Sequence, residues 1–570
     1  MPGGLLNIIS YGNQNIILNG NPSKTFFKTV YAKYSNFGLQ NIRIDYNGQK
    51  NLHLNEDSAF TFKIPRNAEL LLDTYLVFTL PDIWSPIIPP GIYPNHPGAV
   101  DDVWKPYEFK WIENIGTNII KKVSLSIGGQ VIQSFSGQHI KNMVEKDLDY
   151  NKLALFNKMI GMTDELNRPE NMNNRYNNYP NAYYIPSQPG EINVGREPSI
   201  RGRKIYVPLN FWFSFSSKVA LPLVALQYSD VTIDFILRPI TDLYTINDVS
   251  LTAPNGFVKE GIRPSVNNEY HSFYRFIQQP PNEWLLAEDY VNKAYLWNTD
   301  IHVIATYCFL SEEESLVFAK NEQKYLIKDV KEEVITNVTG TKRVKILSTA
   351  MASTWMWYFQ RDDINLRNEW SNFTNWPYKN RIPYDIISAP TNSNTVFVYN
   401  RYIGPGINFK KILNSYIEQT SLINITDLNT NKNKKNIMES MAILFDGKYR
   451  ENDLDAGIYN FIEKYKMSKG NSDDGLYIYN YCLNTDPYDL QPSGAINLSK
   501  FKTIEIEYVT NKPPFDASSE YFTVCDQNGT VIGTTKNLNL YEYSYNLTFV
   551  EERYNIVRFV SGQAGLLYAR

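Results

Sequence analysis

The sequence predicts an all-β protein built from two sandwich-like or barrel-like units. Aromatic residues make up 14% of the 570 residues, and aromatic side chains favour pleated, half-buried surfaces. Several short segments alternate apolar and polar residues, as strands with one buried face do, whereas helical spacing is rare. Because all-β units of roughly 200 to 250 residues fold as one domain, we expect two such units in a chain of this length.

The first strand signals lie in the N-terminal half. Residues 60–64 alternate, and residues 70–80 form a longer apolar run. Residues 122–131 predict a hairpin, because Gly128 and Gly129 supply the positive φ that a two-residue turn needs. This half is therefore expected to contain paired antiparallel strands.

Further strand and turn signals follow along the chain. Residues 231–237 and 503–509 alternate with their apolar side chains on one face. Turns are marked by Asp446-Gly447, Asp474-Gly475 and Asn528-Gly529. Many short strands separated by such turns are typical of a sandwich or barrel.

Two helices are predicted. A nearly amphipathic stripe covers residues 140–148 and continues over 155–160. A second helix is expected from residue 312 to about 328, where Ser311 and Glu314 have the spacing of a capping box.

Long surface loops and a connecting segment interrupt the strand patterns. The loops are rich in Pro, Gly and Asn and cover residues 81–106, 166–203 and 361–435. Long loops are uncommon in compact domains unless they carry function. Residues 240–290 contain several prolines and little periodicity, which predicts a connection between the two units.

Charge and composition exclude several classes of protein. The net charge of −3 is too balanced for a protein that grips nucleic acid through its phosphates, so no direct nucleic-acid binding is expected. No run of 18 apolar residues predicts a membrane span, and the first residues lack the features of a signal peptide. Three cysteines without a CxxC pair predict a soluble chain kept in a reducing compartment.

No segment carries the pattern of a catalytic or cofactor-binding site. The sequence has no GxxxxGK[ST], HExxH or GxSxG motif. None of the histidines has a short metal-ligand spacing to another; they are His53, His96, His139, His271 and His302. We therefore expect no enzyme activity, no metal and no cofactor, and a binding or structural role.

Six short segments, spread from residue 3 to residue 566, match one known family in the same order along the chain. They are Gly3-Gly4-Leu5 with the stretch to Phe37, Ile127-Gly128-Gly129-Gln130, Pro208-Leu209-Asn210-Phe211-Trp212-Phe213 with Leu221-Pro222, Phe318-Ala319 with Tyr325-Leu326-Ile327, Gln491-Pro492-Ser493-Gly494, and Tyr554-Asn555-Ile556-Val557-Arg558 with Gly565-Leu566. On these motifs the chain resembles the major capsid proteins of the nucleocytoplasmic large DNA viruses of eukaryotes. The match departs at residues 347–359, where the family's Asn-His-Pro is missing.

The resemblance implies a double jelly roll, which is two consecutive eight-stranded β-sandwiches with a few short helices and long decorated loops. By analogy with the family, residues 1–25 form an N-terminal arm and residues 26–239 form the first jelly roll. Residues 240–290 connect it to the second jelly roll, at residues 291–570.

The function implied by the resemblance is structural. Three chains would form a homotrimer with a pseudo-hexagonal outline that tiles the shell of a large icosahedral virus. Implied partners are neighbouring capsomers, minor capsid proteins and penton proteins. The implied location is the virion, after assembly in the host cell, in the cytoplasm. Alternatives are a scaffold protein or minor capsid paralogue of the same lineage, and a carbohydrate-binding protein that uses loop tryptophans Trp84, Trp104, Trp370 and Trp376.

Candidate assembly residues follow from the same motifs. In the arm they are Gly3, Gly4, Gln14, Asn21 and Pro22, which we expect at the inner side of the capsid, near minor capsid proteins or the internal membrane, or under the protein's own trimer. Phe26, Phe27 and Tyr31 are expected to anchor the first jelly roll. The remaining candidates make turns: Gly128 and Gly129 in the first jelly roll, and a buried turn of Gln491, Pro492, Ser493 and Gly494 in the second.

Overall fold

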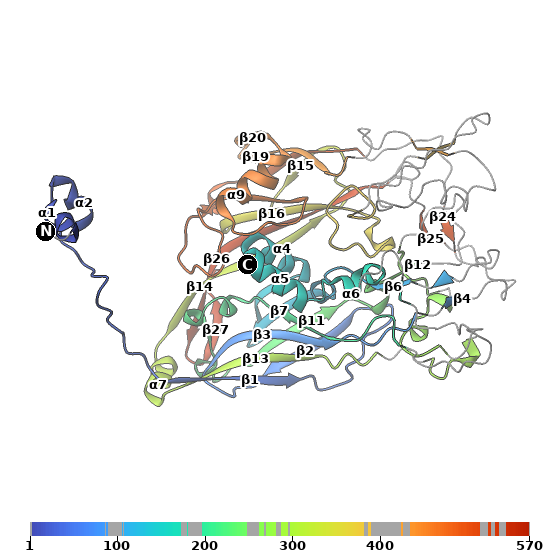
Figure 1. Ribbon diagram of the computed structural model, residues 1–570, viewed down its shortest axis with the longest axis horizontal. Helices are drawn as coiled ribbons and strands as arrows, with labels where there is room; N and C mark the ends of the chain where they lie inside the picture. The colour runs from blue at the N-terminus through green and yellow to red at the C-terminus, as the bar shows by residue number, and fades with distance from the viewer. Residues whose placement is uncertain are drawn as a thin grey trace.

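The fold consists of two β-sandwiches side by side, with an arm at one end (Figure 1). It was obtained as a computed structural model. The structure describes residues 3–568 except 86, 89–104, 107, 173–178, 181–196, 248–260, 267–268, 281–286, 294–296, 381–385, 389–422, 426–433, 513–522, 526–530 and 535–542.

The first sandwich contains two antiparallel sheets. One sheet has the order β1 (Phe37–Asp45), β13 (His302–Leu310), β3 (Leu70–Thr79) and β10 (Leu221–Pro222), with β9 (Lys204–Pro208) also paired to β3. The other has the order β2 (Ser58–Ile64), β11 (Val231–Leu237), β7 (Ile120–Ile127) and β8 (Gln130–Phe135).

Alternating side chains build the core of this sandwich. In β2 every second residue is buried, and β11 pairs with it so that Ile233 lies opposite Phe62. Phe62 packs edge-on against Phe235, with ring centroids 5.7 Å apart. The strands predicted at residues 60–64, 70–80, 122–131 and 231–237 are all present. The alternation of apolar and polar residues therefore predicted these strands correctly, because one face of each strand is buried and the other is not.

The second sandwich has the same two-sheet arrangement. One sheet has the order β14 (Gln323–Ile335), β26 (Tyr545–Val560), β16 (Met351–Arg361) and β21 (Leu476–Asn480), with β22 (Ile496–Asn497) on β16 and β27 (Gln563–Leu566) on β26. The other has the order β15 (Thr341–Lys345), β23 (Ile504–Thr510), β19 (Met438–Phe445) and β20 (Lys448–Asp455).

Both sandwiches follow one strand order. If the eight principal strands of each unit are numbered along the chain, each unit has one sheet with the order 1-8-3-6 and one with the order 2-7-4-5. This arrangement of two packed antiparallel sheets is a jelly roll. The expectation of two consecutive eight-stranded jelly rolls is therefore confirmed.

Short helices connect the strands. Between strands five and six of the first jelly roll lie α4 (Gly137–Asp147), α5 (Tyr150–Met159) and α6 (Asp164–Asn167). The same connection in the second jelly roll holds a π-helix, η12 (Ile458–Ile462), and α9 (Glu463–Met467). The helical stripe predicted at residues 140–160 is confirmed as α4 and α5, which are separate because Asp149 accepts a bond from the Lys152 amide and starts a new helix.

The second predicted helix is shorter than expected. The helix α7 (Glu312–Lys320) joins the two jelly rolls and ends well before residue 328. From Gln323 onward the chain is strand β14, which pairs with β26 along its whole length, so sheet pairing overrides helix propensity there. Ser311 precedes the helix but its side chain makes no cap bond, so the predicted capping box was wrong.

Smaller elements complete the chain. The arm holds α1 (Gly3–Ile9), η1 (Asn13–Asn15) and α2 (Ile16–Asn19), and α3 (Ile115–Asn118) precedes β7. The other strands form short pairs: β4 (Ile87–Ile88) with β5 (Lys105–Pro106), β6 (Glu108–Trp111) with β12 (Tyr244–Asn247), β17 (Ile386–Ser388) with β18 (Ile423–Ile425), and β24 (Thr523–Cys525) with β25 (Val531–Thr534). Single 3₁₀ turns are η2 (Pro169–Asn171), η3 (Trp212–Ser214), η4 (Ser217–Val219), η5 (Leu223–Ala225), η6 (Ile240–Asp242), η7 (Glu269–His271), η8 (Phe273–Arg275), η9 (Ala287–Asp289), η10 (Ile364–Leu366) and η13 (Leu498–Lys500).

The arm and the small strand pairs lie at opposite ends of the molecule. Helices α1 and α2 are at the left of Figure 1, and β4, β24 and β25 are at the right. No helix among the described residues is long and apolar enough to cross a membrane.

The boundary between the jelly rolls differs from the expected one. Residues 302–310 were expected in the second jelly roll, yet they form β13, which pairs with β1 on one side and β3 on the other. The first jelly roll cannot close without its eighth strand, so it extends to Leu310. Residues 240–290 are not only a connection either, because Tyr244 in β12 stacks on Phe109 within the first core.

The β7–β8 turn gives a test of this fold. Gly128 has φ +58°, and a Cβ there would lie 3.0 Å from the Ser229 hydroxyl. We predict that Gly128→Val lowers the free energy of unfolding by about 1–3 kcal/mol, because a β-branched residue is strained at positive φ. Urea denaturation measures this. Gly38→Val, at an open position in β1, is the control and should change stability by less than about 0.5 kcal/mol. Equal effects of the two substitutions would contradict the assignment.

Candidate functional site

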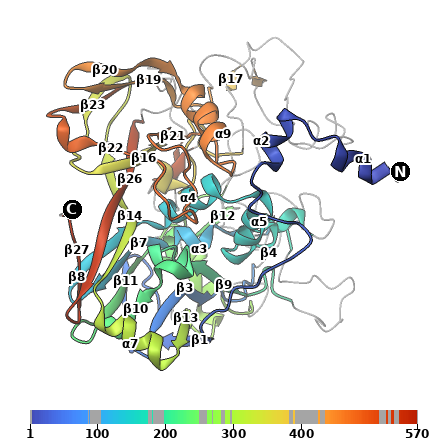
Figure 2. The same cartoon turned by 90° about the vertical axis from the view of Figure 1, so that its left-hand side faces the viewer.

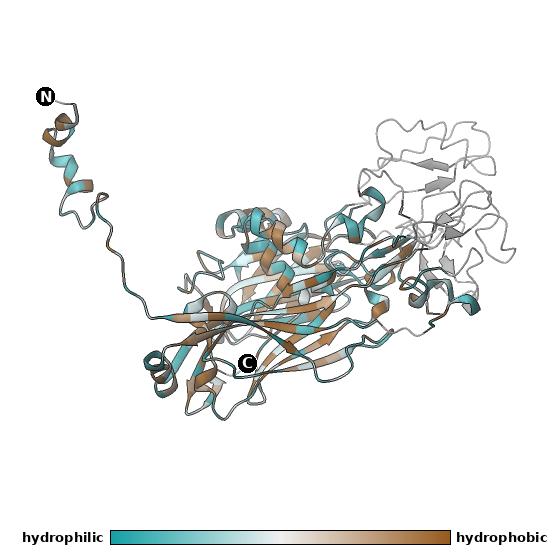
Figure 3. Cartoon of the chain, turned by 60° about the horizontal axis from the view of Figure 1, so that its bottom comes forward, coloured by the Kyte–Doolittle hydropathy of each residue, from teal (hydrophilic) through white to brown (hydrophobic). Residues whose placement is uncertain are grey.

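The candidate residues from the N-terminal motif lie on a detached arm. None of residues 3–36 is buried, and the first strand begins only at Phe37. Gly3, Gly4 and Gln14 are exposed, and Asn21 bends the chain before Pro22 with φ +46°. The arm is thus longer than the expected 25 residues. Figure 3 shows its hydrophobic residues away from both sandwiches.

The expectation that three aromatic residues anchor the first jelly roll was wrong. The exposed fractions are 86% for Phe26, 99% for Phe27 and 87% for Tyr31. These side chains sit on the extended part of the arm, before the sandwich begins, so they contact no core. Their apolar surface is available to something outside this chain.

The turn candidates lie far apart and do not form one site. Gly128 and Gly129 make the β7–β8 turn with φ +58° and +83°, as predicted. The turn in the second jelly roll is not buried as expected, because Gln491, Pro492 and Gly494 are exposed.

The Ser493 side chain ties that exposed turn to Asn484. The Ser493 hydroxyl accepts a bond from the Asn484 amide at 3.0 Å and donates to the Asn484 carbonyl at 2.9 Å. Gly494 has φ +139° and lies against the Tyr481 carbonyl, so the motif serves local backbone geometry.

Buried polar side chains gather at the junction between the two jelly rolls. The sequence patterns did not predict this cluster. Strand β8 of the first jelly roll contacts β14 of the second. The Gln133 amide donates to the Lys328 carbonyl at 2.9 Å, and the Ser136 hydroxyl donates to Glu332 at 2.9 Å. Ser136 also starts helix α4 by accepting a bond from the His139 amide.

Helix α4 brings a buried ion pair to this junction. Lys146 of α4 lies 3.2 Å from Glu552 of β26, and neither side chain is more than 5% exposed. Burial alone would lower the pKa of Lys146, but Asp147 and Glu552 raise it above its ordinary value. Burial would raise the pKa of Glu552, and Lys146 outweighs this and lowers it. Lys146 and Glu552 are therefore both charged at neutral pH.

Neighbouring groups complete the contact around this pair. Burial raises the pKa of Asp147 to about 6, and its carboxylate accepts a bond of 2.6 Å from the Thr485 hydroxyl. Burial lowers the pKa of His139 to about 4, so its imidazole is neutral at physiological pH. Lys146 and Glu552 thus keep their charges at pH 7, whereas Asp147 takes up a proton as the pH falls through about 6.

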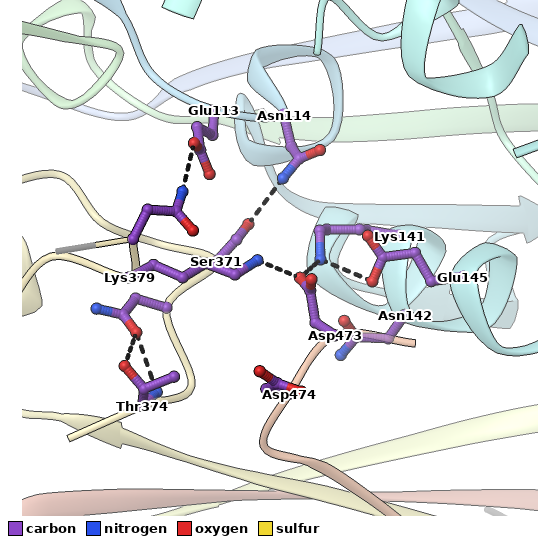
Figure 4. Close-up of polar contacts among 12 residues, drawn as sticks. Glu113, Asn114, Lys141, Asn142, Glu145, Ser371, Thr374, Lys379, Asp473 and Asp474 are labelled. Atoms are coloured by element: carbon purple, nitrogen blue, oxygen red, sulfur yellow. Dashed lines mark hydrogen bonds and ion pairs between the residues drawn. The ribbon is translucent and has the colours of Figure 1, made fainter. Parts of the chain in front are cut away.

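A second buried network lies on the same helix (Figure 4). Lys141 donates to Glu145 at 2.9 Å and to Asp473 of the second jelly roll, and Lys379 binds the same Asp473 at 2.7 Å. Burial would raise the pKa of Asp473, but the two lysines hold it well below its usual range. Two cations on one carboxylate join the helix to two separate loops of the other jelly roll.

Gly470 lies at a close approach of the two jelly rolls. Its amide donates to the Lys146 carbonyl at 2.8 Å, which satisfies a backbone group at the end of α4. A Cβ on Gly470 would lie 2.2 Å from the Glu145 carbonyl oxygen. The contact therefore excludes every residue except glycine.

The chemistry of the junction is that of a rigid joint. Breaking a buried ion pair leaves a charge without its partner in a low-dielectric environment, which is strongly unfavourable. In the part of the chain that the structure describes, no group of three or more His, Cys, Asp and Glu residues is placed to hold a metal ion. The fold and this joint together define a class: a double jelly-roll protein whose two halves are locked side by side.

Two family models match consecutive parts of the chain. Residues 25–268 match the model described as the N-terminus of the major capsid protein. Residues 314–565 match the model of the large eukaryotic DNA virus major capsid protein. The chain belongs to the major capsid protein family of large eukaryotic DNA viruses.

Individual relatives agree with this assignment over the full chain. The chain is 23% identical to the major capsid protein of Chrysochromulina ericina virus and 24% identical to that of Paramecium bursaria Chlorella virus 1, with 100% of both chains covered in each case. Among solved structures, it is similar to a quasi-atomic model of the PBCV-1 virus capsid, with a TM-score of 0.56 and 19% identity over 96% of this chain and 100% of that one. The Faustovirus major capsid protein also has a TM-score of 0.56, at 13% identity over 94% and 92%.

The buried pair at the junction gives a test. We predict that Lys146→Ala lowers the free energy of unfolding by about 3–5 kcal/mol, because Glu552 and Asp147 then stay buried without their cation. Differential scanning calorimetry and urea denaturation measure the loss. Lys152→Ala, at an exposed position of α5, is the matched control and should have an effect below about 0.5 kcal/mol. A Lys146→Ala chain as stable as the control would show that the joint is not held by this pair.

Proposed function

We propose that this protein is the major building block of an icosahedral viral shell and that three copies form one capsomer. The observation that carries the proposal is the identical strand order of the two jelly rolls, 1-8-3-6 and 2-7-4-5 in each, in halves locked side by side. Three such chains in a closed ring present six similar jelly rolls. Their outline is a pseudo-hexagon, which tiles a flat facet.

The geometry of a ring supports this proposal. A cyclic trimer is built from one heterologous interface that closes after three steps. Stable interfaces of this kind commonly bury upwards of about 2,000 Å². The joint through α4 holds the two halves of each chain in one orientation, so every copy offers the same pair of faces to its neighbours.

The two ends of the molecule have different proposed partners. The arm and the small strand pairs lie at opposite ends, so a capsomer would present arms on one side of the shell and loops on the other (Figure 1). We assign the arms to the inner side, where their exposed apolar residues meet minor capsid proteins or the internal membrane. Neighbouring capsomers and penton proteins contact the edges. The protein acts in the virion after assembly in the host cytoplasm.

A carbohydrate-binding role receives no support from the loop tryptophan Trp370. The Trp370 indole donates to the Asp242 carbonyl at 2.9 Å, and the Arg238 guanidinium lies 3.9 Å from its ring centroid. Trp370 therefore packs two parts of this chain together. Copy number in purified virions separates the main proposal from a scaffold protein or a minor paralogue, since only a major capsid protein is abundant there.

Oligomeric state tests the proposal directly. Native mass spectrometry of the recombinant full-length chain is expected to give a species of three times the 65.9-kDa chain mass without a bound cofactor. A chain that stays monomeric at micromolar concentration, or that forms dimers, would contradict the trimeric capsomer.

The arm gives a separate test. Deletion of residues 1–20 is expected to leave the trimer intact, because none of the described residues 3–20 is buried in the chain. The same deletion should impair shell assembly in infected cells, because the contacts of the arm at the inner side are lost. Electron microscopy of particles counts complete shells, with a chain carrying Tyr228→Ala, an exposed substitution outside the arm, as the control. Unchanged assembly would reject the inner-side role.

A further inference from the structure

We propose that the near part of the arm, residues 24–34, crosses to the next copy in the trimer and packs on the outer face of its helix α7. This inference rests on the trimer proposed above and names the partner of one part of the arm. The far part of the arm, residues 3–23, stays free for contacts at the inner side of the shell. Each copy thus gives its arm to one neighbour and receives an arm from the other.

The two parts of the arm differ in charge. Residues 3–23 contain no charged side chain, whereas residues 24–34 contain three lysines, and the first acidic residue of the chain is Asp45. The near part is aromatic as well as basic. Its large apolar side chains, each at least 85% exposed, are Phe26, Phe27, Val30, Tyr31 and Tyr34. This segment therefore has apolar surface to bury and positive charge to pair.

Helix α7 presents an uncovered face of complementary character. Its inner side rests on the first jelly roll through Phe318, which packs against a small cluster of core residues there. No residue of α7 is buried. The outer face is formed by exposed residues one turn apart, Glu312 and Glu313 with Leu316 and Val317, and the last two are 47% and 55% exposed. Carboxylates and apolar side chains thus stand next to each other on this face.

The near part of the arm matches this face in charge and in apolar content. On α7 the two carboxylates lie one helical turn before the two apolar side chains. In the arm, Lys24 and Lys28 flank the pair Phe26-Phe27. With the rings on the apolar turn, the ammonium groups come next to the carboxylates. In such contacts the aromatic rings carry most of the binding energy, and the opposite charges fix the register.

The arm joins the fold beside α7. Phe37, the first residue of β1, pairs with Leu310, and α7 starts two residues later at Glu312. The point where the arm meets β1 and the helix α7 lie at the same corner of the molecule in both views (Figures 1 and 2). The arm and the face that we assign to it are therefore at the same end of every copy.

Distance decides between the chain's own α7 and that of a neighbour. The nine residues of α7 extend over about 13 Å. Phe27 precedes Phe37 by ten residues, which span up to about 33 Å in an extended chain. Because the near part of the arm is extended, Phe26 and Phe27 pass beyond the chain's own helix, and the helix that they reach belongs to a second copy. In a ring of three, each helix receives one arm, so the exchange closes.

A substitution on the arm tests the contact in the full-length chain. We expect wild type to be trimeric, and expect Phe27→Ala to weaken the trimer about tenfold or more, because an aromatic ring is lost from the contact. Val291→Ala is the matched control, since Val291 is 98% exposed and lies outside the arm and α7. Light scattering across a dilution series measures the dissociation, and circular dichroism confirms folding. A Phe27→Ala trimer as stable as the control would overturn the contact, while a monomeric wild type would overturn the trimer itself.

Charge reversal tests whether α7 is the partner. Glu312→Lys with Glu313→Lys, and Lys24→Glu with Lys28→Glu, are each expected to weaken the trimer about fivefold, because like charges then face each other. All four changes together should restore it. Asp164→Lys is the control, because Asp164 is the exposed first residue of α6 as Glu312 is of α7. A fourfold variant weaker than both double variants would show that arm and helix do not meet.

A zero-length cross-linker distinguishes exchange from an arm folded onto its own chain. A carbodiimide joins lysine amines to carboxylates that are in contact. From isolated wild-type trimers we expect covalent dimers and trimers of the 65.9-kDa chain on a denaturing gel, with Lys24 or Lys28 linked to Glu312 or Glu313 by mass spectrometry. The same links confined to the 65.9-kDa band would contradict the exchange.

A membrane is the other surface that suits a basic, aromatic segment. Flotation of trimers with vesicles that contain anionic lipid tests this alternative. We expect wild-type and Phe27→Ala chains to float alike, because Phe27 is already in use within the trimer. Flotation that is lost in Phe27→Ala, with no change in trimer stability, would assign the segment to a lipid surface and overturn the contact with α7.

Discussion

The joint between the jelly rolls is the constraint on which the rest of the structure depends. Helix α4 carries Lys141 and Lys146 into the second jelly roll, where Asp473 and Glu552 receive them. Gly470 allows the backbones to touch. Charges buried in this way need their partners, so the two sandwiches have one relative position. A shell built from many copies requires such a unit, because small errors in the angle between halves would accumulate around a ring and across a facet.

The same joint explains how a repeated fold produces an asymmetric building block. The two jelly rolls share a strand order, but among the described residues their equivalent first strands differ in burial. Strand β14 contacts β8 and three of its thirteen residues are exposed, whereas seven of the nine residues of β1 are exposed. The arm and the small strand pairs lie at opposite ends of the molecule. A ring of such chains in one orientation would therefore have two different faces.

Local sequence patterns predicted those parts of the fold that are decided by residues close together in the chain. Alternation located β2 and β11, and Gly128-Gly129 located the β7–β8 turn. The end of α7 and the position of β13 were missed, because strand pairing with residues more than 200 positions away decides them. The lysines of α4 look like solvent-facing charges in the sequence, and their carboxylate partners come from the other jelly roll. Phe26 and Phe27 look like core residues, because apolar side chains on an arm and in a core share one pattern.

The central claim is that three copies place six equivalent jelly rolls in a closed ring. A cryo-electron microscopy reconstruction of the isolated assembly, calculated without imposed symmetry and viewed along its axis, tests it most directly. Six sandwich densities with nearly equal spacing around the axis are expected. Three separate elongated densities, or an open filament, would contradict it.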